Sequence, residues 1–193
     1  NALPAYNRER SLFAIEIALD IRYYRDLAAA INALGGADFD DARRIIGTRL
    51  DILNILWAYR HRVYYNLSAE EIVNYTLWHT FRTDTNLIRD IALGAPPEDI
   101  LERVWGRGSV DLSLLERATD EASMVTNLES TLERFWWGLA RLAMGGYPFR
   151  LGALLGYLVL QETEIADLVT LLEAKAMRWD RERVCRHLVR CEE

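Results

Sequence analysis

Histidine, cysteine and lysine are scarce in this chain of 193 residues. Its histidines, His61, His79 and His187, are too scattered to suggest a dedicated histidine metal site. The Glu-x-x-His pairs that build dimetal centres in helical bundles do not occur. Cys185, His187 and Cys191 supply three possible zinc ligands where a structural site needs four, and on one helix they would not share a face. We therefore expect no metal and no cofactor.

The two cysteines are expected to be reduced. Cys185 and Cys191 are six residues apart on a predicted helix, which turns them to different faces and separates them beyond disulfide reach. Reduced cysteines are typical of an intracellular compartment.

Long apolar runs and a positive charge balance are missing too. The longest uncharged stretch near the carboxyl half, residues 151–161, is far shorter than the ~20 residues that a membrane-spanning helix needs, so membrane association should run through a partner. A net charge of −6 argues against a nucleic-acid binder, although 22 arginines beside the single lysine, Lys175, could form local patches. The chain begins at Asn1 without methionine and without a signal-peptide pattern.

Catalytic motifs are absent as well. The sequence contains no phosphate-binding loop, dinucleotide fingerprint or nucleophile elbow. Glu162 and Glu164 would project ~200° apart on a helix, so they do not form a paired acid and base. We therefore expect that the protein is not an enzyme. Of the functions considered for this chain, an enzyme with a carboxylate site is the weakest hypothesis.

Helical periodicity dominates what is present and predicts an all-α fold. An apolar stripe from Leu12 to Leu34 predicts the first helix, which should end at Gly35-Gly36. Further helices are predicted at about 41–65, 68–77, 84–93, 98–105, 111–122, 125–144 and 150–178, and a shorter one follows a cap at Asp180.

Glu162 interrupts the apolar stripe of the predicted helix 150–178. It should therefore have a buried partner such as an arginine, or lie at the edge of the core. A structural ion pair is the default interpretation. Among the aromatic residues, Trp57 is predicted to be in the core, while Trp136 and Trp137 must point in different directions.

Part of the chain repeats itself. Residues 49–62 are echoed by 162–175, and each run leads to a break and a short helix capped by Ser68 or Asp180. The alternative is that any two amphipathic helices look alike. The repeat predicts tandem helical bundles, at 1–80 and 81–193, in which Asp51 and Glu164 occupy equivalent places.

Polar residues form a narrow stripe on each long repeat helix. One interpretation is a solvent-exposed strip, stabilised by pairs worth ~0.2–0.5 kcal/mol each. The other is a polar groove or funnel wall on which a partner sits. The stripes are Asp51, Asn54, Ala58 and Arg62 in one helix, and Glu164, Asp167, Leu171 and Lys175 in the other.

Several short motifs together resemble the C subunit, called d in vacuolar enzymes, of V/A-type rotary ATPases. Each motif is degenerate, but together they extend over most of the chain. They are Asp20-x-x-Tyr23-Tyr24, Asp51-x-x-Asn54-Ile-Leu with Arg60-x-Arg62, Leu67-Ser-x-Glu70-Glu71-Ile72, Leu155-Gly-Tyr157, Gln161-Glu162-x-Glu164-Ile, Leu171-Leu-Glu-Ala-Lys175, and Val184-x-x-x-Leu188-Val189.

The resemblance implies a funnel of three similar helical domains without an active site. It implies a rotor adaptor on the cytoplasmic face of the membrane, which caps the proteolipid ring, holds the central stalk and couples ATP to proton or sodium transport. The possible interface residues are Asp51, Asn54, Arg60, Arg62, Glu162, Glu164 and Lys175.

The chain departs from the family pattern in three ways. It holds about two of three units and lacks the leading one. Asp167 stands where an asparagine like Asn54 is expected, and Arg49 stands where an acid is expected. The alternative function is a free-standing helical scaffold that binds another protein.

Overall fold

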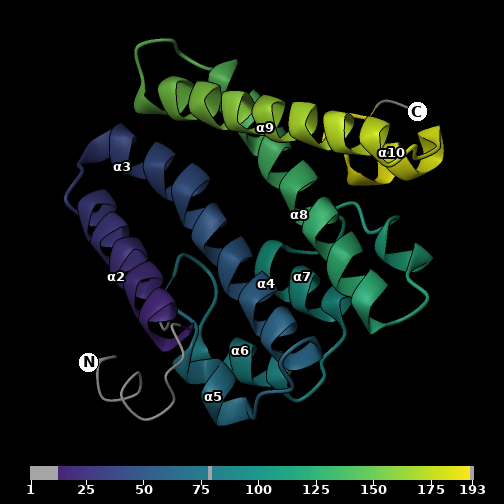
Figure 1. Ribbon diagram of the computed structural model, residues 1–193. Coiled ribbons are helices and arrows are strands. Elements are labelled where there is room, and N and C mark those ends of the chain that lie inside the picture. The colour runs from purple at the N-terminus through teal and green to yellow at the C-terminus, as the bar shows by residue number, and fades with distance from the viewer. Residues whose placement is uncertain (1–12, 78–79, 192–193) are drawn as a thin grey trace.

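The protein is described by a computed structural model that covers residues 13–77 and 80–191 (Figure 1). Every regular element in these ranges is helical, which confirms the all-α prediction. The helices are α2 (Phe13–Asn32), α3 (Gly36–Ala42), α4 (Thr48–Val63), α5 (Ala69–Asn74), α6 (Thr85–Ala92), α7 (Pro97–Trp105), α8 (Glu121–Met144), α9 (Leu151–Ala176) and α10 (Arg181–His187).

Helix α4 lies at the centre of the molecule. It follows α3 through one π-helical turn, η1 (Arg43–Gly47), so residues 36–63 form one helical run, close to the helix predicted at 41–65. In Figure 1, α2 lies along one side of α4 and α8 lies along the other, while α9 crosses one end of the molecule. α4 therefore connects the small helices α5–α7 with the long helices α8 and α9.

The expected helix at 111–122 is wrong. Only a 3₁₀ turn, η2 (Leu115–Arg117), occurs there, and α8 begins at Glu121 rather than after a break at Ser123. The reason is a reciprocal cap: Asp120 accepts a hydrogen bond from the Ser123 N–H at 2.7 Å, and the Ser123 hydroxyl accepts one from the Asp120 N–H at 3.0 Å. Ser123 therefore starts the helix that it was expected to interrupt.

A single cluster of apolar side chains runs from η1 and α4 through α6 and α7 to α8 and α9. Trp136 is buried in this cluster and donates its indole N–H to the Ile45 carbonyl at 2.9 Å. Trp137 is only half-buried, which agrees with the prediction that the two side chains point in different directions. Trp57 was expected in the core but is half-buried, with its ring 5.7 Å from that of Tyr24 in α2.

Glycines bring α9 very close to α8. A Cβ atom at Gly156 would lie 2.6 Å from the Ala140 carbonyl oxygen and 3.0 Å from the Met144 nitrogen, both of which are backbone atoms. Backbone atoms cannot swing aside as a flexible side chain can. The crossing of the two longest helices therefore depends on the missing side chain at position 156.

We expect Gly156→Ala to destabilise the protein by about 1–3 kcal/mol, because the methyl group overpacks the crossing. Gly138→Ala is the matched control in α8, since its Cβ would meet nothing within 4 Å; it should gain up to about 1 kcal/mol from helix propensity. Urea denaturation followed by circular dichroism measures both values. Equal stability of the two variants would contradict the close-crossing argument.

His61 is buried near the end of α4, between the rings of Tyr65 and Tyr75. Burial, and secondarily the charge of Arg60, lower the pKa of this histidine. The unfolded chain therefore takes up this proton at a higher pH than the folded chain. His187 shifts in the same direction, mainly through burial and then through Arg183 and Arg186.

We expect the free energy of unfolding to decrease as the pH falls below about 6.5, the usual pKa of an unfolded histidine. Above that pH both states hold a neutral His61, so these shifts contribute nothing. NMR titration of the His61 ring measures the folded pKa directly. A titration midpoint at or above the usual value would disprove this explanation.

Candidate functional site

Asp51 is completely buried in α4, where it binds the connection between α5 and α6. One of its carboxylate oxygens, Oδ1, accepts hydrogen bonds from the backbone N–H groups of Arg82 and Thr83, each at 2.9 Å, and from the hydroxyl of Thr80. These donors belong to a segment without regular structure. The carboxylate therefore supplies the partners that a helix or sheet would otherwise provide.

Asn54, one turn further along α4, holds the same connection by both atoms of its amide. Its Oδ1 accepts from the Leu77 N–H at 2.7 Å, and its Nδ2 donates to the Leu77 carbonyl at 2.9 Å and to the Thr83 hydroxyl at 3.0 Å. Asp51, Asn54 and Ala58 are all fully buried. The first polar stripe is thus an internal anchor, and neither a solvent-exposed strip nor an open groove.

Asp167 of α9 binds a neighbouring backbone segment in a comparable way. It is almost fully buried and accepts hydrogen bonds from the Val189 N–H at 2.9 Å and the Arg190 N–H at 3.3 Å, while its ion pair with Arg190 measures 3.0 Å. Asn54 and Asp167 therefore each bind backbone that lies just after a short helix. The segments that precede those short helices, between α4 and α5 and between α9 and α10, share one further feature: Asn66 and Arg178 both have positive φ, 49° and 55°.

This anchoring explains why the expectation of two reduced cysteines is wrong for this structure. Helix α10 ends at His187, so Cys185 and Cys191 do not share a helix. Asp167 holds the backbone in between, and the chain returns until the two cysteine Cα atoms are 5.3 Å apart, where the structure has a disulfide. The spacing argument failed because it extended the helix beyond its end.

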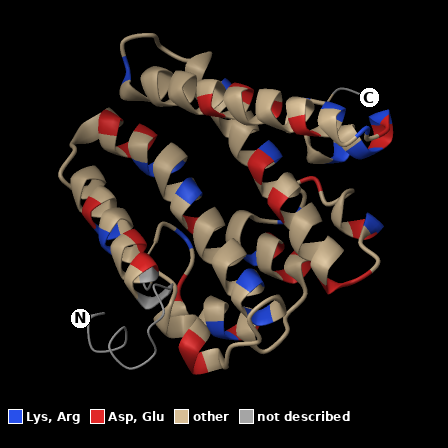
Figure 2. Cartoon of the chain, viewed as in Figure 1, with Lys and Arg blue, Asp and Glu red and all other residues tan. Residues whose placement is uncertain are grey.

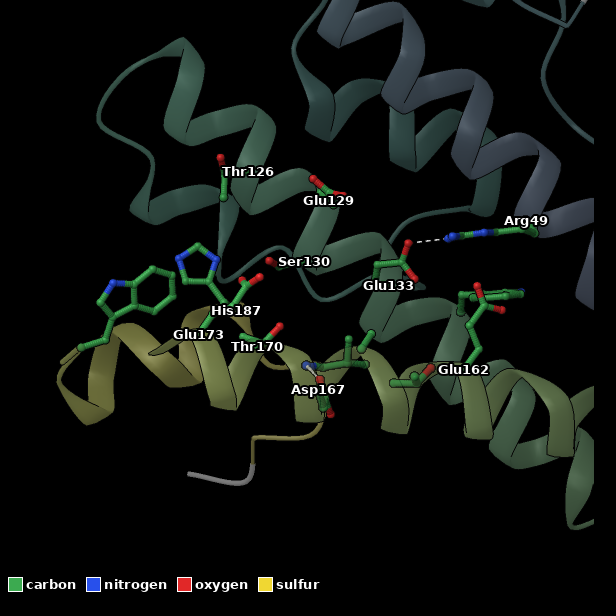
Figure 3. A pocket seen from close by; sticks show the side chains of 15 residues that line it. Arg49, Thr126, Glu129, Ser130, Glu133, Glu162, Asp167, Thr170, Glu173 and His187 are labelled. Carbon is green, nitrogen blue, oxygen red and sulfur yellow. Dashed lines mark hydrogen bonds and ion pairs between the residues drawn. The ribbon is translucent and has the colours of Figure 1, made fainter. Parts of the chain in front are cut away.

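A polar groove of about 400 Å³ lies between α8 and α9, closed at one end by α10 and bordered at the other by α4 (Figure 3). Acidic side chains from α8 and α9 face each other across it, and the aromatic rings of Trp136 and Trp179 complete it. Its lining residues are Arg49, Thr126, Glu129, Ser130, Glu133, Trp136, Glu162, Thr163, Ala166, Asp167, Thr170, Glu173, Trp179, His187 and Val189.

Arginines neutralise only part of the acidic charge in the groove. Arg49 of α4 pairs with Glu133 of α8 and stacks over the ring of Trp136, with its guanidinium carbon 4.4 Å from the ring centre. Arg60 pairs with Glu129 at 2.7 Å. Arg49 and Arg60 thus bind the central helix to one wall of the groove.

The opposite wall, which is formed by α9, contains two carboxylates that make no ion pair within the described part of the chain. These are Glu162 and Glu173 of α9, and both are exposed. Figure 3 shows Glu162 at the same end of the groove as Arg49 and Glu133. Of the two alternatives for Glu162, the position at the edge of the core agrees with its exposed side chain, while the ion pair taken as the default is not found among residues 13–77 and 80–191. The groove is therefore an acidic surface that remains available to a cationic group.

The other predicted interface residues are not gathered at this groove. Arg62 donates to the Ile91 carbonyl at 3.2 Å and pairs with Glu121. Glu164 is half-buried and accepts a long hydrogen bond, 3.5 Å, from Gln161, so its surroundings differ from those of the fully buried Asp51. Lys175 is exposed in the last turn of α9.

Sequence reasoning missed the α8 side of the groove. Glu129 and Glu133 belong to no motif, and only the packing of α8 against α4 brings them to Arg60 and Arg49. For Asp167 a signal existed, because it lies at the repeat offset from Asn54. It was interpreted as a departure from the family pattern, although a carboxylate accepts backbone hydrogen bonds as an amide oxygen does.

The groove has the chemistry of a binding surface. In residues 13–77 and 80–191, no three His, Cys, Asp or Glu side chains are grouped so that they could hold a metal ion. Its acidic, half-open walls are suited to a basic or hydrogen-bonding partner.

Across residues 13–77 and 80–191, no helix is sufficiently long and apolar to span a membrane.

We expect Asp51→Ala to destabilise the protein by about 2–5 kcal/mol, because it leaves the N–H groups of Arg82 and of the buried Thr83 without their acceptor. Asp51→Asn should cost less, since its amide oxygen can still accept from them. Glu164→Gln is the control at the sequence-equivalent position of α9 and should change stability by less than about 0.5 kcal/mol. Thermal unfolding compares the three, and an equal loss for Asp51→Ala and Glu164→Gln would refute the anchoring role.

Comparison with known proteins places the chain in a family. Residues 1–186 match the family model described as ATP synthase (C/AC39) subunit. No solved structure matches the chain.

Curated relatives agree with that match. The chain is 24% identical over 177 residues to the C subunit of the A-type ATP synthase of Methanobrevibacter smithii, and 27% identical over 183 residues to the protein of that name from Methanothermobacter thermautotrophicus. Each alignment covers 91% of this chain and 46% of the relative, so the chain spans about half the length of these proteins. Because the family model extends over nearly the whole sequence, the chain belongs to the ATP synthase (C/AC39) subunit family.

Proposed function

We propose that this chain is a non-catalytic rotor adaptor of a V/A-type rotary ATPase, linking the central stalk to the membrane proteolipid ring. The observation that carries the proposal is the family match over residues 1–186, supported by relatives named as the C subunit of A-type ATP synthases. The adaptor would act on the cytoplasmic face and contact the membrane only through the ring. It would couple ATP turnover to proton or sodium transport without an active site of its own.

The packing of the molecule is compatible with torque transmission. An adaptor must carry force between two partners without deforming, and interiors packed to crystal-like density are stiff. Here the Gly156 crossing joins α9 to α8, and the Arg49 and Arg60 ion pairs join α8 to α4. Three long helices are thereby connected into one framework.

The groove between α8 and α9 is our candidate for the stalk-binding surface. Glu162 and Glu173 offer exposed negative charge there, and the neighbouring acids are already paired with arginines. A basic or polar segment of a stalk protein would find charge complementarity in it. Of the interface residues predicted from the family motifs, Glu162 is the one that lines this groove.

The two anchored breaks support a repeated helical unit. In each, a long helix is followed within three residues by a residue of positive φ, Asn66 or Arg178, and a short helix then begins at a capping side chain, Ser68 or Asp180. We propose that residues 48–77 and 151–189 descend from the same helix–break–helix unit.

Co-purification tests the proposed function. The chain, carrying an affinity tag, should isolate the proteolipid ring and central-stalk subunits from detergent-solubilised membranes of its source. Glu162→Arg should reduce stalk recovery by at least about 10-fold, because it reverses the charge of the groove wall while keeping an exposed position. Glu116→Arg, an exposed acid on η2 outside the groove, is the control and should recover the stalk normally.

Absence of both ring and stalk subunits would overturn the adaptor proposal and favour a helical scaffold with another partner. Normal stalk recovery with Glu162→Arg would leave the adaptor role in place and reject the groove as its binding surface.

A further inference from the structure

The disulfide between Cys185 and Cys191 lines a pocket that is separate from the acidic groove. This second pocket has a volume of about 710 Å³ and lies between α10, the middle of α8 and residues 111–117. Both cysteines are half-buried in its wall. A small molecule that enters the pocket can therefore reach the two sulfur atoms.

Arginines dominate the charge of this pocket, although the whole chain has a net charge of −6. Figure 2 shows basic residues along α10, which forms one wall. The acids of the lining are already engaged, since Asp111 accepts a hydrogen bond from the Ser113 N–H at 3.0 Å and Glu182 lies 3.9 Å from Arg186. The pocket is therefore suited to an anion. Its charged lining residues are Asp111, Arg117, Arg134, Arg181, Glu182 and Arg186.

Arg134 of α8 is fixed directly beside the disulfide. Its Nη2 donates to the Cys185 carbonyl at 2.8 Å and to the Leu188 carbonyl at 3.0 Å, and its Nε donates to the Leu188 carbonyl at 3.3 Å. No carboxylate among residues 13–77 and 80–191 pairs with this guanidinium. Positive charge close to a disulfide stabilises the thiolate that leaves when the disulfide is attacked.

Hydrogen bonds that do not involve sulfur keep the two cysteines near each other. Asp167 accepts from the N–H groups of Val189 and Arg190, while Arg134 binds the carbonyls on the other side of the turn. These contacts remain possible when the sulfur–sulfur bond is broken. Two thiols held in this way react as an intramolecular pair, so the disulfide can form again after reduction.

We propose that Cys185 and Cys191 form a reversible redox site, and that the arginine-lined pocket recruits the anionic low-molecular-weight thiol that reduces it. The volume of the pocket is in the range that binds small molecules. Accessible sulfur, uncompensated arginine charge and a held turn meet at this one place. The inference goes beyond the proposed function and does not rest on it.

The chemistry is thiol–disulfide exchange. The small thiol loses its proton to solvent, and its thiolate attacks Sγ of one cysteine, which forms a mixed disulfide and releases the other cysteine as a thiolate. A second small thiol then attacks the mixed disulfide and leaves as the oxidised small-molecule disulfide. Both protein thiolates take up protons, so two electrons pass from the two small thiols to the protein.

The redox site is connected to the closed end of the acidic groove. The loop that the disulfide closes contains His187 and Val189, and both residues line the groove (Figure 3). Reduction therefore removes a covalent constraint from that end of the groove.

Reduction rates measured with two thiols of opposite charge test the proposal. The full chain is treated separately with mercaptoethanesulfonate, which is anionic, and with cysteamine, which is cationic. The released cysteines are trapped with a maleimide and counted by mass spectrometry. We expect Arg181→Glu to lower the ratio of the anionic to the cationic rate at least about 10-fold, because it replaces a positive charge of the pocket with a negative one.

Arg181→Glu should fold normally, since position 181 is exposed and is the first residue of α10, where an acidic side chain is favourable. Arg89→Glu is the matched control, because Arg89 is an exposed arginine on α6, outside the pocket, and its substitution changes the net charge equally. This control should keep the wild-type ratio. Circular dichroism should show the same helix content in the oxidised and reduced chains.

Two thiols that react with the maleimide before any reductant is added, in protein isolated in air, would overturn the redox site. The same rate ratio in Arg181→Glu as in the wild type would overturn the recruitment of anionic thiols. Failure of the oxidised form of mercaptoethanesulfonate to restore the protein disulfide would overturn its reversibility.

Discussion

The buried polar pair Asp51 and Asn54 is the constraint on which much of this structure depends. Burying a carboxylate and an amide in the interior of a protein is costly unless each group finds hydrogen-bond partners. Here the partners are backbone groups of the connection between α5 and α6. The cost of burial is thereby offset, and an otherwise irregular segment is tied to the central helix. α6 begins directly after that tied segment and α7 follows α6, and the apolar faces of both helices then complete the core around α4.

A second level of organisation joins α4 to the long helices. The Arg49–Glu133 and Arg60–Glu129 ion pairs link α4 to α8, and Gly156 lets α9 cross α8 at backbone contact. These features also shape the acidic groove, because α8 and α9 form its walls. The same contacts that stiffen the framework therefore leave Glu162 and Glu173 facing open space. In this family member, the connected helical framework and the polar groove have a common structural origin.

Sequence reasoning performed best where a signal was local. The helices at 84–93, 98–105 and 150–178 were predicted within a few residues of α6, α7 and α9, because their ends are marked by capping residues, proline or glycine. It failed at 111–122, where the Asp120–Ser123 cap resembled a break. It also failed for Cys185 and Cys191, because the turn between them depends on Asp167, 22 residues before Val189.

The sequence by itself determined the all-α fold, the family and the positions of most helices, because periodicity and capping act over one or two turns. The roles of the polar residues were decided only by the tertiary structure. Asp51 and Asn54 have the same spacing whether they face solvent, a groove or a loop, and only the packing of the α5–α6 connection buries them. Likewise, Glu162 became part of a groove because α8 brought Glu129 and Glu133 opposite it. Hydrogen bonds and ion pairs between distant segments leave no periodic trace in a sequence.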